Sequence, residues 1–435
     1  MTTITVVGTG YVGLIQGLCL ARLGHDVTCV DTDMEKLNRL TSGEPTIYEP
    51  GVAELLESEI ASGRIRFTDP GEGWKELIGD IVFVAVGTPM APNGAADLTA
   101  VRTVVDALAA EATRPFVLAM KSTVPPGTGR ELAARHLSKA AVEISYVSNP
   151  EFLREGHAVE DWYGSDRVVI GADNPAAAEA LQTVYAKLDS PVLVTDIASA
   201  ETIKYASNAF LSTKISFINE IANLCDCVDA DIDAVSKGIG MDRRIGPDFL
   251  KAGIGYGGSC FPKDTRALDF IATLSGYQFE LLKSVIEVNN RQRLLPVITL
   301  SRAIPDLVGK RVALLGLAFK PFTDDVRETP ALDITPLLQD RGAVVVAYDP
   351  VAAPIEVAGV ERCSTVWEAL EGACAAVLIT EWPEFLELDW AAVRGVMAEP
   401  AIVYDGRNAL VAAEVQGAGL TYMAVGRDGA HRVSR

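Results

Sequence analysis

The sequence predicts an α/β protein in which two Rossmann-like, doubly wound domains are joined by a central helical region. Three observations support this. Apolar, β-branched runs alternate with helical patterns in the first part of the chain, helical spacing alone fills the middle, and the alternation begins again near residue 310. The expected domains are residues 1–197, 198–300 and 301–435.

The first domain opens with the strand pattern ITVV, a glycine-rich turn and a helical pattern that ends near Gly24. Strand patterns follow at residues 26–33, 81–89, 116–127 and 144–152, each ending in a polar loop. Strands that alternate with helices favour a parallel sheet, whose ligands bind at the carboxyl ends of the strands.

The middle of the chain carries apolar residues at helical spacing over residues 198–240 and again over 281–304. This region is long enough to join two domains or to mediate dimerisation. The last third then repeats the layout of the first, with strand patterns at residues 310–321, 343–350, 375–382 and 401–408. We therefore expect two α/β domains on either side of the helical region.

Composition narrows the function classes. The chain has 435 residues, 49% of them hydrophobic and 22% charged, with a formal net charge of −20. This charge argues against a nucleic-acid or anionic membrane surface. The sequence shows no signal-peptide pattern and no apolar run long enough to span a bilayer. Its seven cysteines lack the spacing of a disulfide scaffold or a metal site, so we expect a cytoplasmic protein without a metal.

A dinucleotide site is indicated by Gly8, Gly10 and Gly13, which follow the first strand and open a helix. The first glycine permits a tight turn, the second lets the backbone approach a pyrophosphate, and the third allows close helix–strand packing. Tyr11 and Val12 lie inside this motif. Asp31 ends the second strand, where an acid would bond the adenosine ribose and repel a 2′-phosphate. A plain glycine turn is the alternative, but the combination favours NAD as cofactor.

Three further polar residues are candidate cofactor contacts. Lys36 lies just past the second strand, where it reaches the ribose or is simply a solvated helix residue. Thr88 and Thr123 follow other strands and should face the cofactor, although threonine is also a common turn residue.

The stretch GIGYGGSCFPKD, residues 253–264, places Cys260 on a flexible loop beside opposite charges. Lys263 can favour the nucleophilic thiolate, and Asp264 can position or deprotonate water. The alternatives are a structural loop for the cysteine and a simple Lys263–Asp264 ion pair. Beside a nicotinamide, a nucleophilic thiol suits oxidation of an aldehyde through a thiohemiacetal and a thioester.

Seven motifs in order resemble the UDP-glucose/GDP-mannose dehydrogenase family: GTGYVGL, VGTP, KSTVPPGT, NPEFLREG, ETIKYASNAFLSTKISFINEIA, FLKAGIGYGGSCFPKD and GLAFKPFTDDVRETP. The resemblance implies NAD-dependent, four-electron oxidation of UDP-glucose to UDP-glucuronate, with two NAD reduced. GDP-mannose or another nucleotide sugar is the alternative substrate. The resemblance also implies a homodimer formed through the central helix, while the net charge already argues against a nucleic-acid or membrane partner.

The resemblance also assigns roles to individual residues. Cys260 takes the place of the nucleophile, and Lys204 that of the cation facing the developing oxyanion. Asp264 matches the residue that orients water, Thr123 one near the reacting centre, and Arg327 a cofactor contact, while Lys263 also serves the cofactor. Glu155 belongs to a segment that touches substrate and cofactor. The implied substrate contacts are Glu151, Phe152, Leu153, Arg154, Glu155, Lys204, Asn208, Phe249, Leu250, Lys251, Ala252, Gly253, Gly257 and Lys320.

Each of these assignments has a simpler reading. Lys204 and Asn208 would otherwise form an exposed polar face, and Lys320 and Arg327 would balance the neighbouring acids Asp324 and Asp325. A hydroxyacid dehydrogenase and a non-catalytic NAD-binding regulator are further alternatives. The first needs no thiol, and the second predicts damage at Cys260 or Lys204, both of which are present.

Overall fold

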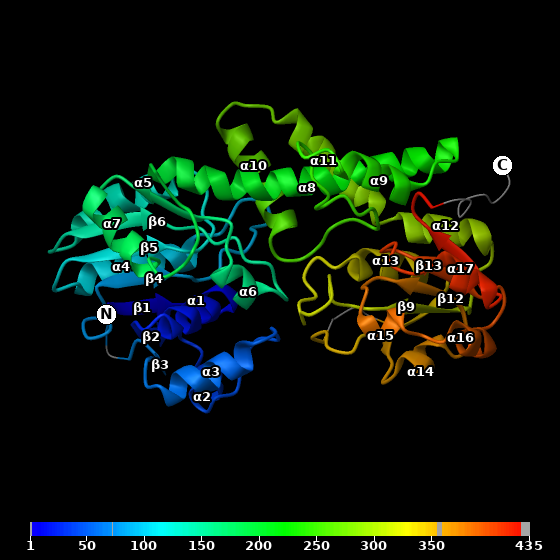
Figure 1. The fold of residues 1–435 in the computed structure, drawn as a ribbon, viewed down its shortest axis with the longest axis horizontal. Coiled ribbons are helices and arrows are strands. Elements are labelled where there is room, and N and C mark those ends of the chain that lie inside the picture. The colour runs from blue at the N-terminus through cyan, green and yellow to red at the C-terminus, as the bar shows by residue number, and fades with distance from the viewer. Residues whose placement is uncertain (1, 72, 355–358, 428–435) are drawn as a thin grey trace. The chain divides into compact units, whose positions relative to one another are not determined.

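The computed structural model describes residues 2–71, 73–354 and 359–427. The chain divides into two compact units, Met1–Ser207 and Asn208–Arg435, and Figure 1 shows a sheet with flanking helices in each of them. The boundary falls inside helix α8 (Ile197–Val228). The three-part division expected from the sequence stays a prediction.

The first unit is built on a sheet with the strand order β3-β2-β1-β4-β5-β6-β7-β8. Its first six strands have the doubly wound Rossmann order, with the switch point between β1 and β4. All neighbouring pairs are parallel except β6 and β7, which are antiparallel. The strands are β1 (Thr3–Val7), β2 (Asp26–Val30), β3 (Ile65–Thr68), β4 (Ile81–Val84), β5 (Phe116–Met120), β6 (Ile144–Ser148), β7 (Val168–Ala172) and β8 (Val192–Thr195).

Helices cover both faces of this sheet because its strands are apolar on both sides. In β4, Ile81 and Phe83 join the core under one set of helices, while Val82 and Val84 join the core under the other. The helices are α1 (Tyr11–Arg22), α2 (Met34–Thr41), α3 (Val52–Ala61), α4 (Thr99–Glu111), α5 (Thr128–Arg135), the short η1 (Leu137–Lys139), α6 (Ala158–Tyr163) and α7 (Pro175–Val184).

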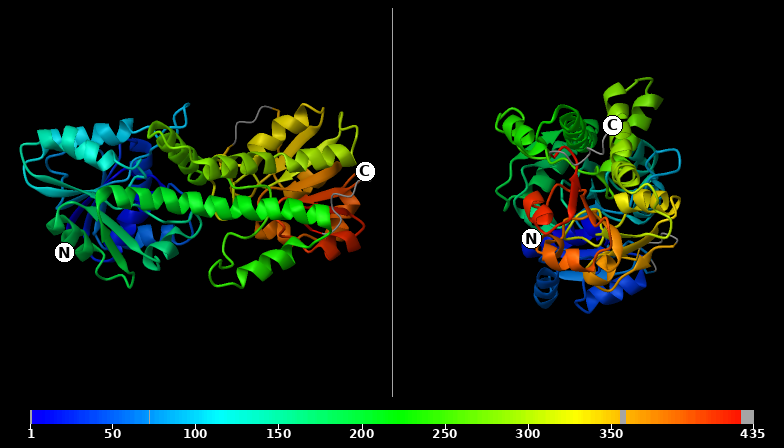
Figure 2. Two further views of the ribbon diagram at one scale, coloured as in Figure 1. Left: turned by 90° about the horizontal axis from the view of Figure 1, so that it is seen from above. Right: turned by 90° about the vertical axis from the view of Figure 1, so that its right-hand side faces the viewer.

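The helical middle of the chain is dominated by α8, which is one continuous helix of 32 residues (Figure 2). The helices after it belong to the second unit. They are α9 (Ile232–Gly240), α10 (Phe261–Leu274), α11 (Glu280–Gln292) and α12 (Leu295–Ala303). Among the described helices, none is both long enough and apolar enough to cross a membrane.

The second unit repeats the Rossmann order in a parallel sheet, β11-β10-β9-β12-β13-β14. Its elements are β9 (Arg311–Leu315), α13 (Pro330–Gln339), β10 (Val344–Tyr348), β11 (Glu361–Arg362), α14 (Val366–Leu370), β12 (Ala373–Leu378), α15 (Pro383–Leu386), α16 (Trp390–Val396), β13 (Ile402–Asp405), α17 (Ala412–Gly417) and β14 (Thr421–Ala424). The predicted fold class is confirmed.

Candidate functional site

The glycine motif lies between β1 and α1, at the carboxyl edge of the first sheet. Gly8 has φ of +94°, and Gly10 is the N-cap of α1. A Cβ on Gly13 would lie 1.8 Å from the Gly8 carbonyl oxygen, so only glycine fits there. A Cβ on Gly10 would meet no atom within 4 Å. The turn therefore leaves open space in front of a helix N-terminus, which fits a dinucleotide pyrophosphate. Tyr11 and Val12 begin α1 and are half-buried.

Asp31 follows β2, and its Oδ2 accepts hydrogen bonds from the Thr9 backbone N–H at 2.8 Å and the Thr9 hydroxyl at 2.7 Å. Lys36 Nζ donates to the same oxygen at 3.0 Å. Burial raises the pKa of Asp31, but the bonds from Thr9 and Lys36 outweigh it and lower the pKa to about 2. Asp31 is therefore an ionised acceptor beside the glycine turn, as a ribose-binding acid should be.

Thr88 and Thr123 lie beyond β4 and β5, two neighbouring strands of the same sheet. The Thr88 hydroxyl donates to the Thr123 carbonyl at 3.0 Å, so the two loops are bonded to each other. Both loops stand at the carboxyl edge that carries the glycine turn, where cofactor contacts are expected.

A buried ion pair joins Glu151 to Lys204, whose Nζ lies 2.8 Å from Glu151 Oε1. Both side chains are at most 7% exposed. Burial raises the pKa of Glu151, yet Lys204 and the Leu153 N–H bring it below the ordinary value. Lys121 is buried nearby, and burial lowers its pKa to about 8. This cluster carries two lysines and one carboxylate, and Lys204 is not the exposed polar residue of the simpler reading.

The segment after Glu151 is held by contacts within the first unit. The Arg167 guanidinium lies over the Phe152 ring, with its Cζ 4.0 Å from the ring centre. Lys204 Nζ lies 5.4 Å from the centre of the same ring. Leu153 N–H donates to Glu151 Oε2 at 2.6 Å. Arg154 is exposed and pairs with Asp161, whereas Glu155 is half-buried.

Cys260 is the N-cap of α10 in the second unit, and its side chain is partly exposed. Its Sγ lies 3.6 Å from the Ser259 hydroxyl. A position at the N-terminus of a helix favours a thiolate over a thiol. By contrast, Cys19, Cys29, Cys225, Cys363 and Cys374 are buried.

Asp264 lies one turn into α10 and is 1% exposed. Its Oδ2 accepts from the Asn208 amide at 2.6 Å, and its Oδ1 lies 2.5 Å from Lys263 Nζ. The ion pair of the simpler reading therefore exists, but its carboxylate is buried and also bonded to Asn208, which is buried as well. Asn208 lies on α8, four residues after Lys204.

The loop before Cys260 is packed against backbone. Phe249 has φ of +62°, Lys251 is exposed, and Leu250 and Ala252 are buried. A Cβ on Gly253 would lie 2.6 Å from the Gly406 carbonyl oxygen, and one on Gly257 would lie 2.3 Å from that of Glu328. The loop therefore has no room for side chains at these two positions, and its backbone path is fixed.

Two predicted contacts lie in the segment after β9. Lys320 Nζ is 5.2 Å from the ring centre of Phe319. Arg327 forms an ion pair with Asp325 at 2.7 Å, with its side chain 64% exposed. The charge balance of the simpler reading is thus present for Arg327.

Sequence reasoning missed several polar residues that hold these loops. Asn219 Oδ1 accepts from Gly253 N–H at 2.9 Å, and Asn289 Oδ1 accepts from Tyr256 N–H at 2.8 Å. Arg407 Nη2 donates to the Phe319 carbonyl at 2.8 Å. In the first unit, Glu49 binds the backbone of residues 156 and 158. The only sequence signal near Arg407 was the strand pattern at residues 401–408, which includes it.

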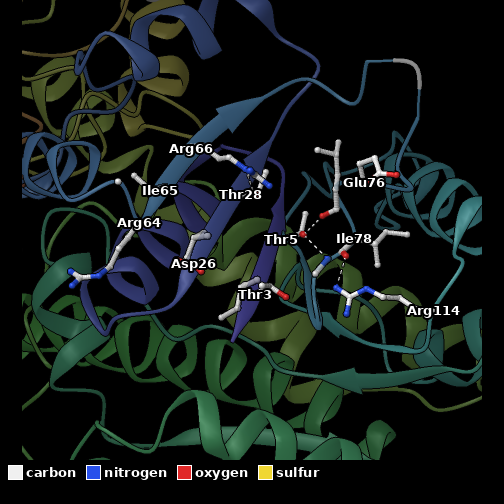
Figure 3. A pocket seen from close by; sticks show the side chains of 15 residues that line it. Thr3, Thr5, Asp26, Thr28, Arg64, Ile65, Arg66, Glu76, Ile78 and Arg114 are labelled. Atoms are coloured by element: carbon white, nitrogen blue, oxygen red, sulfur yellow. Dashed lines mark hydrogen bonds between the residues drawn. The ribbon is translucent and has the colours of Figure 1, made fainter. Parts of the chain in front are cut away.

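A pocket in the first unit lies at the amino ends of the strands, on the edge of the sheet opposite to the glycine turn (Figure 3). Thr3, Asp26 and Ile65, which begin β1, β2 and β3, line it. Ligands of parallel sheets bind at the carboxyl ends of the strands, so we do not assign the cofactor to this pocket.

In the second unit, Glu361, Cys363 and Glu368 offer ligand atoms close enough for a metal ion. Arg311 already occupies the neighbourhood, with guanidinium nitrogens 3.6 Å from Glu361 Oε2 and from Cys363 Sγ. A cation is thus already provided, and we assign no metal to this group.

Known proteins match this chain over nearly its whole length. The UDP-glucose/GDP-mannose dehydrogenase family matches through its NAD binding domain over residues 2–189, its central domain over 198–291 and its UDP binding domain over 313–412. A UDP-glucose 6-dehydrogenase of Bacillus subtilis (strain 168) is 46% identical over 98% of this chain and 94% of its own length. One of Rhizobium meliloti (strain 1021) is 45% identical over 98% of this chain and 99% of its own.

Two solved structures superpose on this chain over nearly its whole length. A UDP-glucose dehydrogenase of Pyrobaculum islandicum superposes with a TM-score of 0.90 at 38% identity, covering 99% of this chain and 98% of that one. A UDP-D-ManNAc dehydrogenase of Pyrococcus horikoshii superposes with a TM-score of 0.88 at 26% identity, covering 98% and 99%.

Proposed function

This chain belongs to the UDP-glucose/GDP-mannose dehydrogenase family, and we propose that it oxidises UDP-glucose to UDP-glucuronate with two molecules of NAD. One observation carries the proposal within the site. Cys260 presents a partly exposed thiol at the N-cap of α10, one turn before Asp264, which is bonded to Asn208 and Lys263. A dehydrogenase that stops at the aldehyde needs no such thiol.

The first unit carries the glycine turn and Asp31 of the proposed cofactor site. NAD, when bound, accepts the hydride released in each of the two oxidations. The chain's contribution is to hold it. Gly10 leaves room for the pyrophosphate, and Asp31 would accept hydrogen bonds from the ribose hydroxyls. Thr88 and Thr123 lie at the same carboxyl edge of the sheet. Tyr11, Val12, Lys36, Glu155, Lys263 and Arg327 complete the proposed cofactor contacts.

Cys260 acts in the second oxidation. Its thiolate adds to the aldehyde carbon at C6 and forms a thiohemiacetal. Loss of a hydride from that carbon and of the proton from its hydroxyl group gives a thioester, which water then cleaves to the carboxylate and the free thiol. The covalent bond keeps the aldehyde from leaving between the two oxidations.

Lys204, Asn208 and Asp264 assist these steps. Lys204 is a cation fixed by Glu151, and a fixed cation stabilises a developing oxyanion without further reorganisation. Asp264 is buried and held on both oxygens by Asn208 and Lys263, so its carboxylate has a fixed direction, and we assign it the role of orienting the hydrolytic water. Asn208 sets the direction of the Asp264 carboxylate.

The proposed sugar and nucleotide contacts are Glu151, Phe152, Leu153, Arg154, Glu155, Lys204, Asn208, Phe249, Leu250, Lys251, Ala252, Gly253, Gly257 and Lys320. The match of residues 313–412 to a UDP binding domain supports a uridine nucleotide.

Side-by-side kinetics test the substrate. We expect kcat/KM for UDP-glucose to exceed those for GDP-mannose and for UDP-N-acetylmannosamine by at least about a hundredfold, because a site built to bond one polar group rejects analogues that lack it. A higher kcat/KM with either of the other two nucleotide sugars would refute the assignment.

We also propose that the protein is a cytoplasmic homodimer formed through α8. Phe210, Phe217, Leu224 and Val228 are between 53% and 65% exposed and recur every seven or four residues along this helix. Such spacing places them on one side of the helix, as in helix–helix contacts. All seven cysteines are free, which suits a reducing compartment.

The double variant Phe217→Glu/Leu224→Glu tests the interface by sedimentation. We expect the wild type to sediment as a dimer and the variant as a monomer, since two buried charges would face the partner. A dimeric variant would place the interface elsewhere.

A further inference from the structure

Glu49 is a buried carboxylate in the loop between α2 and α3, and the reaction proposed above gives it no part. Glu49 is only 7% exposed. Its Oε2 accepts from the Gly156 N–H at 2.6 Å, and its Oε1 accepts from the Ala158 N–H at 2.6 Å. Both oxygens are thus directed at the chain that follows the segment 151–155.

The same carboxylate also contacts the glycine motif between β1 and α1, called the cofactor turn below. The phenol of Tyr11 donates to Glu49 Oε2, and its oxygen accepts from the Gly156 N–H at 3.1 Å. Burial first, and then Glu49, raise the pKa of Tyr11, so the phenol stays protonated and remains a donor. Tyr11 is the first residue of α1 and lies inside the glycine motif.

The segment 151–155 is therefore fixed at both ends. Glu151 is held by Lys204 at 2.8 Å, and Gly156 is held by Glu49 and Tyr11. Glu155 lies between these anchors, directly before Gly156. Glu49 thus bonds both Tyr11, in the glycine motif, and the backbone of Gly156, directly after Glu155.

We propose that Glu49 is a positioning residue that couples the cofactor turn at Tyr11 to the substrate segment 151–155. The proposal rests on the proposed function in one respect, namely that this segment faces the sugar nucleotide. Charge-assisted bonds to backbone N–H groups are strong and directional, so Glu49 fixes the spacing between the two binding elements. A simple helix cap at α6 would need only the Ala158 bond.

Glu49→Gln is the test variant because it keeps the shape but turns one acceptor into a donor. That donor would face a backbone N–H, which costs at least one buried hydrogen bond. Glu59→Gln is the matched control. Glu59 is also buried in the first unit, at 1% exposure, but it binds Arg22 and Ser62 rather than any proposed ligand contact.

Both variants are measured as full-length protein by calorimetric titration with NAD and by thermal unfolding. We expect both to lower Tm, but only Glu49→Gln to weaken NAD binding, by about tenfold, the effect of one lost hydrogen bond. Tyr11→Phe removes the phenol alone and should weaken NAD by about threefold while preserving the fold. It decides the question if Glu49→Gln does not fold.

The proposal is overturned if NAD binds Glu49→Gln, or Tyr11→Phe in its place, as tightly as it binds Glu59→Gln. With UDP-glucose as substrate, Glu49→Gln should also raise KM for the sugar nucleotide, whereas Glu59→Gln should not. A wild type that binds NAD but does not turn over UDP-glucose would refute the proposed function, and the NAD titrations would still decide the role of Glu49.

Discussion

The buried pair of Lys204 and Glu151 gives a quantitative prediction. Replacing Lys204 by Met keeps most of the side-chain volume but leaves the Glu151 carboxylate buried without its cation. Removing one partner of a buried pair costs about 3–5 kcal/mol. Lys121 also attracts this carboxylate, so we expect a loss at the lower end, about 3 kcal/mol, from the free energy of unfolding of the first unit.

The assay is urea unfolding of the full chain at pH 7, followed by fluorescence and circular dichroism. Lys204→Met, Glu151→Gln and the double variant form a double-mutant cycle. The double variant should be less destabilised than the sum of the two single variants by about 1–3 kcal/mol, because it leaves no charge of the pair unpaired. Strict additivity of the two losses would refute the reasoning.

The pH dependence gives an independent check of the same pair. The native pKa of Glu151 lies below its ordinary value. Its stabilisation is therefore complete above the unfolded pKa, about 4.3, and is lost as the pH falls through the native pKa. In Lys204→Met we expect the pKa of Glu151 to rise, because only the Leu153 N–H and Lys121 then oppose the effect of burial. The stability difference between wild type and variant should shrink between pH 7 and pH 5, and a constant difference would contradict the assignment.

Three further predictions concern the first unit. Gly10→Ala should leave Tm unchanged but weaken NAD binding, measured by titration, because its methyl group enters the open space in front of the α1 N-terminus. Its counterpart Gly13→Ala should fail to fold or lose several degrees in Tm, because its Cβ would lie 1.8 Å from the Gly8 carbonyl oxygen. Asp31→Asn should weaken NAD by about tenfold and narrow the preference for NAD over NADP in steady-state kinetics. Burial raises the pKa of Glu201 to about 7, so its contribution to stability is fully present below the unfolded pKa, about 4.3, and is lost as the pH rises from there through 7. Glu201→Gln should therefore flatten the dependence of Tm on pH between 5 and 8, and an unchanged slope would contradict this.

The sequence predicted the fold class because each strand run and each glycine turn is a local signal. Gly8, Gly10 and Gly13 mark the first turn by spacing alone, and Asp31 follows from its place at a strand end. Strand direction is not a local property, however. Nothing in the residues of β7 predicts that it pairs antiparallel to β6.

The site was predicted less completely. Cys260 and Asp264 are conspicuous because they are adjacent to glycines and to Lys263. Glu49 was missed because its partners, Gly156 and Ala158, lie 107 and 109 residues away. Those partners are also backbone N–H groups, which leave no signature in a sequence. Asn219 and Asn289 escaped notice for the same reason.

The central claim is that Cys260 carries the sugar through the second oxidation. The direct measurement is NADH formed per UDP-glucose consumed, at limiting sugar, for wild type, Cys260→Ala and Cys227→Ala. Cys227 is exposed and lies outside the site, so it controls for loss of a thiol. We predict two NADH and UDP-glucuronate for wild type and Cys227→Ala, and a failure of Cys260→Ala to complete the second oxidation. Two NADH with Cys260→Ala, or one with wild type, would contradict the account.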